Sequence, residues 1–541
     1  MAIDALCLMP EALIGDFMKS LYFTSEHEAF RNTVRSFVER EVTPHGDTWE
    51  RERRIPRFIW KRMGDLGFLG INHPEAYGGT AADFFYSVVF LEELNRSTMG
   101  GFSAAVSVHS YMATEYITRF GTEALKREYL VPAITGDKIG ALAVTEPNTG
   151  SDVAAIRTRA VRDGEHYILS GSKTFITNGV FGDFVLVAAK TDPSAGVGGI
   201  SLILVDRDAP GFTARQLHKI GWHCSDTAEL SFDEVRVPVT RLIGEENRGF
   251  YYIMQCFQLE RLVSAVLYVS GAALCLEATL KYIAEREAFN RSLSKFQVIR
   301  HTLAGLKAEL EAARQLTYYT CWLHNARVEA VGYCSMAKLI STELMKKMAD
   351  TCLQYYGGYG YMDEYLMSRI YRDARVGTIV GGTSEIMREI IARLMIDQVS
   401  YGTVPAESAR PPAEEPVRGI EGPAMLEPAK TMPTTTAEMI RSLPDRFRPE
   451  KAGDWETVFH FDIAGPGGGR FTVMVRKGVC TVEDGLKGAP ECVVKTSDHV
   501  YRDVELGKAN AEMALITGKI KISDLAEMMR FIKAFRRLPK A

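Results

Sequence analysis

Residues 143–152 of this 541-residue chain carry side chains suited to binding a polar ligand. The run Ala143-Val144-Thr145-Glu146-Pro147-Asn148-Thr149-Gly150-Ser151-Asp152 places three hydroxyls, two carboxylates and one amide in a loop. Apolar residues from 139 to 143 precede it, as expected for a strand that enters a turn. A loop of this kind presents backbone N–H groups together with side-chain oxygens, which suits a ligand with a phosphate and a polar ring. On composition alone, an ordinary turn is the simpler interpretation.

The loop lies where the sequence pattern changes. Residues 1–137 include helical apolar spacings from residue 24 onward, with Ser25 as a candidate N-cap, and none of them stands out as catalytic. Residues 138–242 contain short apolar runs separated by turns, which is typical of a β-domain. Long apolar helical segments fill 243–400 and predict a four-helix bundle, a kind of element that often forms subunit interfaces.

The last part of the chain differs in composition. Residues 401–433 hold seven of the 21 prolines and few large apolar side chains, which predicts an extended linker. Residues 434–541 begin with a helical pattern, continue with strand-like runs joined at 465–469 by a glycine-rich hairpin loop, and end with helices studded with methionine. We therefore expect a multidomain α+β protein whose last domain is small and separate.

Composition excludes several classes of function. The net charge of −4 and the absence of basic blocks give no sign of nucleic-acid binding. Nine scattered cysteines without a C-x-x-C pair predict neither a disulfide framework nor a metal site, and they fit a reducing compartment. The N-terminus does not resemble a signal peptide, and no run of about 18 apolar residues is evident, so we expect no membrane span and a cytoplasmic location.

Several separated motifs resemble the acyl-CoA dehydrogenase family over about residues 24–398. Val144-Thr145-Glu146-Pro147 with Gly150-Ser151-Asp152 is similar to its first flavin signature, and Phe175-Ile176-Thr177-Asn178-Gly179 to its second, with Phe175 where Trp is common. The resemblance implies bound FAD. The contacts it implies from this half of the chain are Leu142, Val144, Thr145, Ser151, Phe175 and Thr177.

Three later segments match further contacts of that family. Arg286-Glu287-Ala288-Phe289 with Gln297 resembles the segment that reaches a neighbouring subunit's FAD, which implies a homodimer or homotetramer. The loop from Gln354 through Gly357 and Gly358 resembles the one that holds the adenosine end, and Thr383-Ser384-Glu385 the third flavin contact. The guanidinium of Arg286 is chemically suited to pyrophosphate, because its fork pairs bidentately with phosphate oxygens. An ordinary surface ion pair with Glu285 or Glu287 is the alternative for Arg286.

The catalytic base is where this chain departs from many family members. They carry a glutamate at the position of Gly381, and a glycine cannot accept a proton. Long-chain and isovaleryl-type members take the base from a helix, and Gln258-Leu259-Glu260-Arg261-Leu262 resembles that segment. The helical neighbours of Glu260 are almost all apolar, which predicts a poorly solvated carboxylate with a raised pKa. A structural ion pair with Arg261 remains the alternative, and Asp363 and Glu364 are rival carboxylates in a polar turn.

The resemblance implies α,β-dehydrogenation of a long or branched acyl-CoA by FAD. Glu260 would take the α-proton, and the backbone N–H of Gly381 would stabilise the thioester oxygen. Ser151, Arg261 and Gly382 would contact the substrate, and electrons would pass to an electron-transferring flavoprotein. No metal is implied.

Residues 434–541 resemble a sterol carrier protein type-two domain, most clearly at Met513-Ala514-Leu515-Ile516-Thr517-Gly518-Lys519-Ile520-Lys521-Ile522. This resemblance implies a site for a lipid or an acyl-CoA. Asp524 follows Ser523 where Gly-Asp is usual, so the next helix could begin differently. Two other functions stay open: a flavin oxidase or monooxygenase on the same fold, and a lipid-binding carrier whose dehydrogenase part is inactive.

Overall fold

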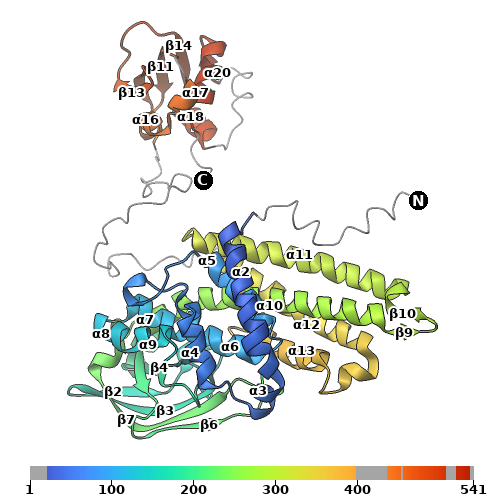
Figure 1. Ribbon diagram of the computed structural model, residues 1–541. Coiled ribbons are helices and arrows are strands. Elements are labelled where there is room, and N and C mark those ends of the chain that lie inside the picture. The colour runs from blue at the N-terminus through green and yellow to red at the C-terminus, as the bar shows by residue number, and fades with distance from the viewer. Residues whose placement is uncertain (1–20, 398–434, 453–454, 507–518, 537–541) are drawn as a thin grey trace. The chain divides into compact units, whose positions relative to one another are not determined.

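The computed structural model describes residues 21–397, 435–452, 455–506 and 519–536. These residues form two units, one before and one after residue 405. The predicted linker at 401–433 and most of the Met513–Ile522 motif lie outside the described residues. The predicted order of a helical block, a β-domain, a helical block and a small α+β unit is confirmed (Figure 1).

The first block is helical, and short π-helical turns interrupt its helices at 38–42, 108–113 and 126–130. Its α-helices are α2 (Ser25–Phe37), α3 (Gly46–Glu52), α4 (Arg57–Asp65), α5 (Phe84–Asn95), α6 (Gly100–Ser107), α7 (Thr114–Phe120), α8 (Glu123–Leu125) and α9 (Val131–Ile134). The expected N-cap Ser25 is wrong by one residue. Thr24 caps α2, and the His27 side chain bonds back to the Thr24 N–H, so histidine takes the place that Glu or Gln holds in most capping boxes.

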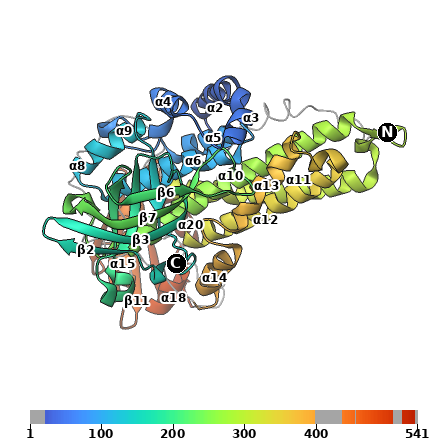
Figure 2. The same ribbon diagram turned by 90° about the horizontal axis from the view of Figure 1, so that it is seen from below.

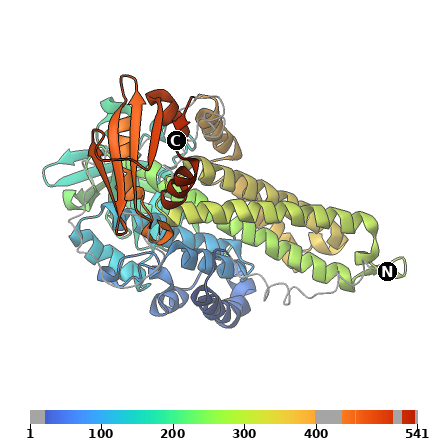
Figure 3. The same ribbon diagram turned by 90° about the horizontal axis from the view of Figure 1, so that it is seen from above.

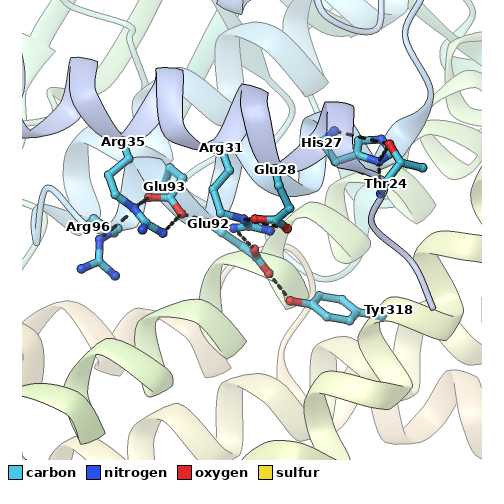
Figure 4. A network of polar contacts seen from close by, with 9 residues as sticks. All are labelled: Thr24, His27, Glu28, Arg31, Arg35, Glu92, Glu93, Arg96 and Tyr318. Carbon is cyan, nitrogen blue, oxygen red and sulfur yellow. Dashed lines mark hydrogen bonds and ion pairs between the residues drawn. The ribbon is translucent and has the colours of Figure 1, made fainter. Parts of the chain in front are cut away.

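A partly buried network of ion pairs fixes α2 onto α5 and α11 (Gln297–Asn325) (Figure 4). Arg31 contacts Glu92 at 2.7 Å, and Arg35 contacts Glu93 at 2.8 Å. Tyr318 of α11 donates to the same Glu92 carboxylate. Because the three helices share these partners, the first block is tied to the helical bundle that follows the β-domain.

The central domain is a twisted, mostly antiparallel sheet. Its strands are β1 (Gly140–Ala143), β2 (Arg159–Asp163), β3 (His166–Thr177), β4 (Phe184–Lys190), β5 (Ile200–Asp206), β6 (Phe212–Gln216), β7 (Thr227–Pro238) and β8 (Leu242–Ile243). They run in the order β6-β7-β3-β2-β4-β5-β8, and β1 pairs parallel with β4. The β3–β7 ladder shifts register between Lys173 and Ile176, so a bulge falls within the second predicted flavin signature.

Long helices build the third block: α10 (Gly249–Glu285), α11, α12 (Val331–Tyr356), α13 (Leu366–Ala374) and α14 (Ser384–Met395). The hairpin of β9 (Glu287–Ala288) and β10 (Arg291–Ser292) joins α10 to α11. Figures 1 and 2 show the sheet near one end of the long helices and this hairpin at the other.

Helix α10 is long and apolar enough to cross a membrane by length and composition, which the sequence argument overlooked. Its most apolar window is 56% buried inside the protein. Residues of α10 belong to three hydrophobic clusters, which also include side chains of the first block, the sheet and the other bundle helices. Its apolar composition is therefore explained by core packing.

The second unit is a five-stranded sheet with helices (Figure 3). Its elements are α15 (Thr436–Arg441), α16 (Leu443–Arg446), α17 (Pro449–Ala452), β11 (Thr457–Ala464), β12 (Gly469–Arg476), β13 (Val479–Asp484), β14 (Cys492–Ser497), α18 (Asp498–Glu505), β15 (Lys521–Ile522) and α20 (Leu525–Ala534). The strand order is β13-β12-β11-β14-β15, and the predicted hairpin loop at 465–469 joins β11 to β12. Asp524 is the N-cap of α20 and accepts from the Glu527 N–H.

Candidate functional site

The carboxyl group of Glu260 is buried in the core of the first unit. Glu260 lies on α10 with 7% of its surface exposed, and the hydroxyl of Tyr116 on α7 donates to its Oε1 atom at 3.3 Å. Burial raises the pKa of Glu260 to about 7, while the Tyr116 hydrogen bond and the charge of Arg261 act in the opposite direction. A carboxyl group in this state can accept a proton near neutral pH.

Tyr116 is a site residue that the sequence pattern does not reveal. It is fully buried and 144 positions from Glu260 in the chain, and its spacing marks it only as part of an apolar helix face. The rival carboxylate Asp363 is exposed and pairs with Arg372 at 2.6 Å.

Gly381 and Gly382 form a left-handed turn before α14. Their φ angles are +63° and +90°, a region that glycine occupies without strain. A Cβ on Gly381 would meet no atom within 4 Å, whereas one on Gly382 would lie 2.6 Å from Cε of Met387. The open space beside Gly381 leaves its backbone accessible, and the turn is followed by Thr383, the N-cap of α14.

The loop at 143–152 is held from behind by a buried ion pair. Lys173 of β3 lies with its Nζ atom 2.9 Å from both Glu146 Oε1 and the Val144 carbonyl oxygen. The Glu146 carboxylate also accepts from the backbone N–H groups of Arg157 and Thr158. Burial lowers the pKa of Lys173 to about 8, although Glu146 opposes the change. Burial raises the pKa of Glu146, but Lys173 and Thr158 outweigh it, so the net shift is downward.

These contacts bring the two predicted flavin signatures together. The Thr174 N–H donates to the Thr145 carbonyl at 2.9 Å, so β3 lies directly beside the first loop. Of the predicted contacts here, Val144 is buried, Leu142, Thr145 and Thr177 are half-buried, and Ser151 and Phe175 are exposed.

The backbone conformation of Phe175 is energetically costly for a residue other than glycine, and such strain is often found at functional sites. Its φ is +63°, its side chain is 70% exposed, and it occupies the bulge in β3. A strained backbone that presents a large aromatic ring to solvent is characteristic of a ligand contact. The hydroxyl of Ser384, at the start of α14, is buried and has no hydrogen-bond partner among the described residues. Both features fit an aromatic, polar group such as the flavin ring.

The remaining predicted contacts form a second, distal group. The guanidinium of Arg286 lies 5.6 Å from the ring centroid of Tyr359, which brings the end of α10 beside the loop after α12. Phe289 has a φ of +54° and is 89% exposed. Gln297, Gln354, Gly357 and Gly358 are also exposed, and a Cβ at either glycine would meet nothing within 4 Å. This open, polar surface fits a diphosphate and an adenosine.

The two groups of predicted contacts lie far apart within one chain. Lys338 of α12 contacts the Gly382 carbonyl, and Gln354 lies sixteen positions further along the same helix. At 1.5 Å per residue this is roughly 24 Å along the axis. We group the predicted residues Glu260, Gly381, Gly382, Thr383 and Glu385 with the two flavin signatures as the proximal group. The distal group consists of Arg286, Phe289, Gln297, Gln354, Gly357 and Gly358. Within the described ranges, no cluster of His, Cys, Asp and Glu could hold a metal ion.

Comparisons with known proteins match this arrangement over most of the chain. Models of the acyl-CoA dehydrogenase N-terminal, middle and C-terminal domains match residues 24–137, 141–235 and 247–396. The model of the SCP-2 sterol transfer family matches residues 438–536.

Individual relatives cover the same first unit. The long-chain specific acyl-CoA dehydrogenase of Sus scrofa mitochondria is 42% identical over 69% of this chain and 87% of its own length. The mitochondrial isovaleryl-CoA dehydrogenase of Oryza sativa subsp. japonica is 35% identical over 69% and 92%. The crystal structure of an acyl-CoA dehydrogenase from Geobacillus kaustophilus is 44% identical, with a TM-score of 0.68 over 70% of this chain and all of that one.

Proposed function

Because this chain belongs to the acyl-CoA dehydrogenase family, we propose that it converts a long- or branched-chain acyl-CoA to the trans-2-enoyl-CoA, with Glu260 as the base. The observation that carries this proposal is the position of Glu260. Its carboxyl group is buried on α10, its pKa is raised to about 7, and the position of Gly381 offers no competing carboxylate.

In the proposed reaction the α C–H bond breaks and its proton goes to Glu260. The thioester oxygen gains negative charge as this happens, and the Gly381 N–H would stabilise it, a contribution of roughly 3 kcal/mol for one such donor. A bound FAD supplies the acceptor for the β-hydrogen, which leaves with its electron pair as hydride. Ser151, Arg261 and Gly382 would orient the thioester, and the buried apolar surroundings of Glu260 keep water from it.

The experiment that tests this proposal is anaerobic titration of the FAD-loaded protein with acyl-CoAs of varied length and branching. Loss of the flavin's yellow colour, restored by an artificial dye, is the expected result. A flavin that no acyl-CoA bleaches would favour the lipid-binding carrier. A flavin that is bleached but reoxidised rapidly by oxygen alone would favour the oxidase or monooxygenase.

The rate of flavin reduction is expected to rise with pH around pH 7. The base must be ionised, and the pKa of Glu260 is raised to about 7, so the rate is low below this value and reaches a plateau above it. The hydrogen bond from Tyr116 lowers the pKa of Glu260, so the Tyr116→Phe variant should move the midpoint to higher pH. Stopped-flow reduction across pH 5.5–9 measures both midpoints. A flat profile for the natural protein would contradict the assignment.

We further propose that each FAD is shared between two copies of the chain. The proximal contacts of one copy would hold the flavin ring, and Arg286, Phe289, Gln297, Gln354, Gly357 and Gly358 of another copy would hold its diphosphate and adenosine. The separation of roughly 24 Å along α12 supports this division. A homodimer or homotetramer would satisfy it. An electron-transferring flavoprotein is the proposed acceptor of the electrons, and the cytoplasm the proposed location.

For the second unit we propose binding of a lipid or an acyl-CoA that it supplies to the first. Deleting residues 401–541 is then expected to raise the apparent KM for a long acyl-CoA about tenfold, because a tethered carrier increases the local substrate concentration. The kcat value, and the kinetics on a short acyl-CoA used as the control, should change little. Steady-state assays with both substrates test this, and unchanged kinetics on the long acyl-CoA would exclude delivery.

A further inference from the structure

Lys338 is a buried cation that the reaction described above does not use. It lies on α12 with no exposed surface, and its Nζ atom donates to the Gly382 carbonyl oxygen at 2.5 Å. Burying a lysine is costly unless its charge is bound, so this contact needs an explanation beyond packing. The hydrogen bond between Lys338 and Gly382 joins α12 to the turn that precedes α14.

That turn has few other means of holding its shape. Gly381 and Gly382 are consecutive left-handed residues without side chains, and no atom would lie within 4 Å of a Cβ on Gly381. Glycine pairs are flexible because they have many accessible backbone conformations. Thr383 fixes the turn on one side by capping α14 through the Ile386 N–H, and Lys338 fixes it on the other.

We propose that Lys338 is a positioning residue for the dehydrogenation: its ammonium group holds the Gly382 carbonyl and so fixes the Gly381 N–H that stabilises the thioester oxygen. This inference rests on the proposed function. It goes beyond that function by assigning a role to a side chain on α12 whose ammonium group contacts the Gly382 carbonyl oxygen.

The electrostatic surroundings agree with such a role. Burial lowers the pKa of Lys338 to about 8, and the positive charge of Arg261 lowers it further, while Glu343 and Glu385 oppose both. Arg261 follows the proposed base directly in the chain. The cation is therefore close enough to Arg261 for the two charges to interact, and both favour negative charge on nearby oxygen atoms.

The test uses a long-chain 3-thiaacyl-CoA bound to the FAD-loaded full chain. Sulfur replaces the β-carbon in this probe, so the α-proton can be removed but no β-hydrogen can follow. The anion interacts with oxidised flavin to give a long-wavelength absorbance band, and its pH dependence reports how well the oxygen is stabilised. Lys338→Met should reduce ionisation of the probe about tenfold, less than the 10²–10³ expected for losing the donor outright.

Two further variants separate positioning from stability. Lys347→Met is the matched control, because Lys347 lies on the same helix but is exposed and pairs with Glu309 at 2.6 Å. Lys338→Gln keeps an N–H donor without the charge and should give an intermediate effect. The reduction rate with a true substrate should fall in parallel with probe ionisation, while the Kd of the probe changes less.

Each outcome of these measurements either supports or overturns the positioning role of Lys338. The proposal is overturned if Lys338→Met ionises the probe and reduces its flavin within twofold of Lys347→Met. It is also overturned if Lys338→Met differs from the control in its melting temperature alone. If both Lys338 variants fail to fold or to retain FAD, Lys338 is a structural residue and the proposal fails. If acyl-CoAs do not bleach the flavin of the natural protein and the probe does not ionise on it, the proposed function itself fails. If the natural protein gives both signals and the Lys338 variants match it, only the role of Lys338 fails.

Discussion

Replacing Glu260 by Gln is expected to slow flavin reduction by about 10²–10⁴-fold, the usual contribution of a positioned general base. Glutamine has nearly the same shape but cannot take the α-proton. The FAD should stay bound, because no predicted flavin contact is removed. Anaerobic stopped-flow reduction by the best acyl-CoA measures the rate, and the absorbance ratio of flavin to protein measures retention.

Glu277→Gln is the matched control for this variant. Glu277 lies on the same helix α10, but its side chain is 44% exposed and pairs with Lys281 at 2.8 Å. Its replacement should leave the reduction rate within about twofold. If Glu260→Gln retained the rate of the natural protein, the base would have to be elsewhere, and the exposed Asp363 and Glu364 would be the next candidates.

The Glu260→Gln substitution should also change the free energy of unfolding in a pH-dependent manner. The folded protein holds the pKa of Glu260 near 7, above the ordinary value of 4.5, so folding favours its protonated form. Stability from this group is fully present below pH 4.5 and is lost as pH rises through 7, a cost of about 3 kcal/mol at pH 8. Glu260→Gln removes this cost, so its melting temperature should exceed that of the natural protein at pH 8 and approach it at pH 5.

The burial of Glu260 could be predicted because the cause is local. Its helical neighbours, such as Cys256 and Val263, are apolar, and the structure buries both. Tyr116 could not be predicted in the same way, since its contact with Glu260 depends on how α7 packs against α10. The roles of individual site residues remain predictions that the variants above test.

The β-domain shows the same difference between local and long-range causes. The apolar runs at 229–232 and 235–237 predict two short strands, whereas the structure has one continuous strand, β7, from Thr227 to Pro238. The left-handed conformation of Phe175 depends on a register shift against β7, which no local pattern encodes. The burial of Lys173 could not be predicted either, because a lysine within a strand ordinarily indicates a solvent-exposed face.

Lys173→Met is expected to destabilise the first unit by about 3–5 kcal/mol, because it leaves the Glu146 carboxylate charged and buried without its cation. Neither side chain of this pair is more than 2% exposed, and Lys173 also binds the Val144 carbonyl in the first predicted flavin loop. The variant should therefore lose FAD as well as stability. Thermal melting with and without added FAD separates the two effects, since ligand binding itself stabilises the folded state.

Two variants test whether the unpaired charge is the cause. The double variant Glu146→Gln with Lys173→Met has no charge to bury and should recover much of the lost stability, as neutral replacements of buried ion pairs often do. It should recover less of the FAD affinity, because the Val144 carbonyl still lacks its lysine. Lys347→Met breaks an exposed pair instead and should cost at most about 1 kcal/mol. If Lys173→Met has the same melting temperature as the Lys347→Met control and keeps its FAD, the two predicted flavin loops are held by their backbone contacts alone.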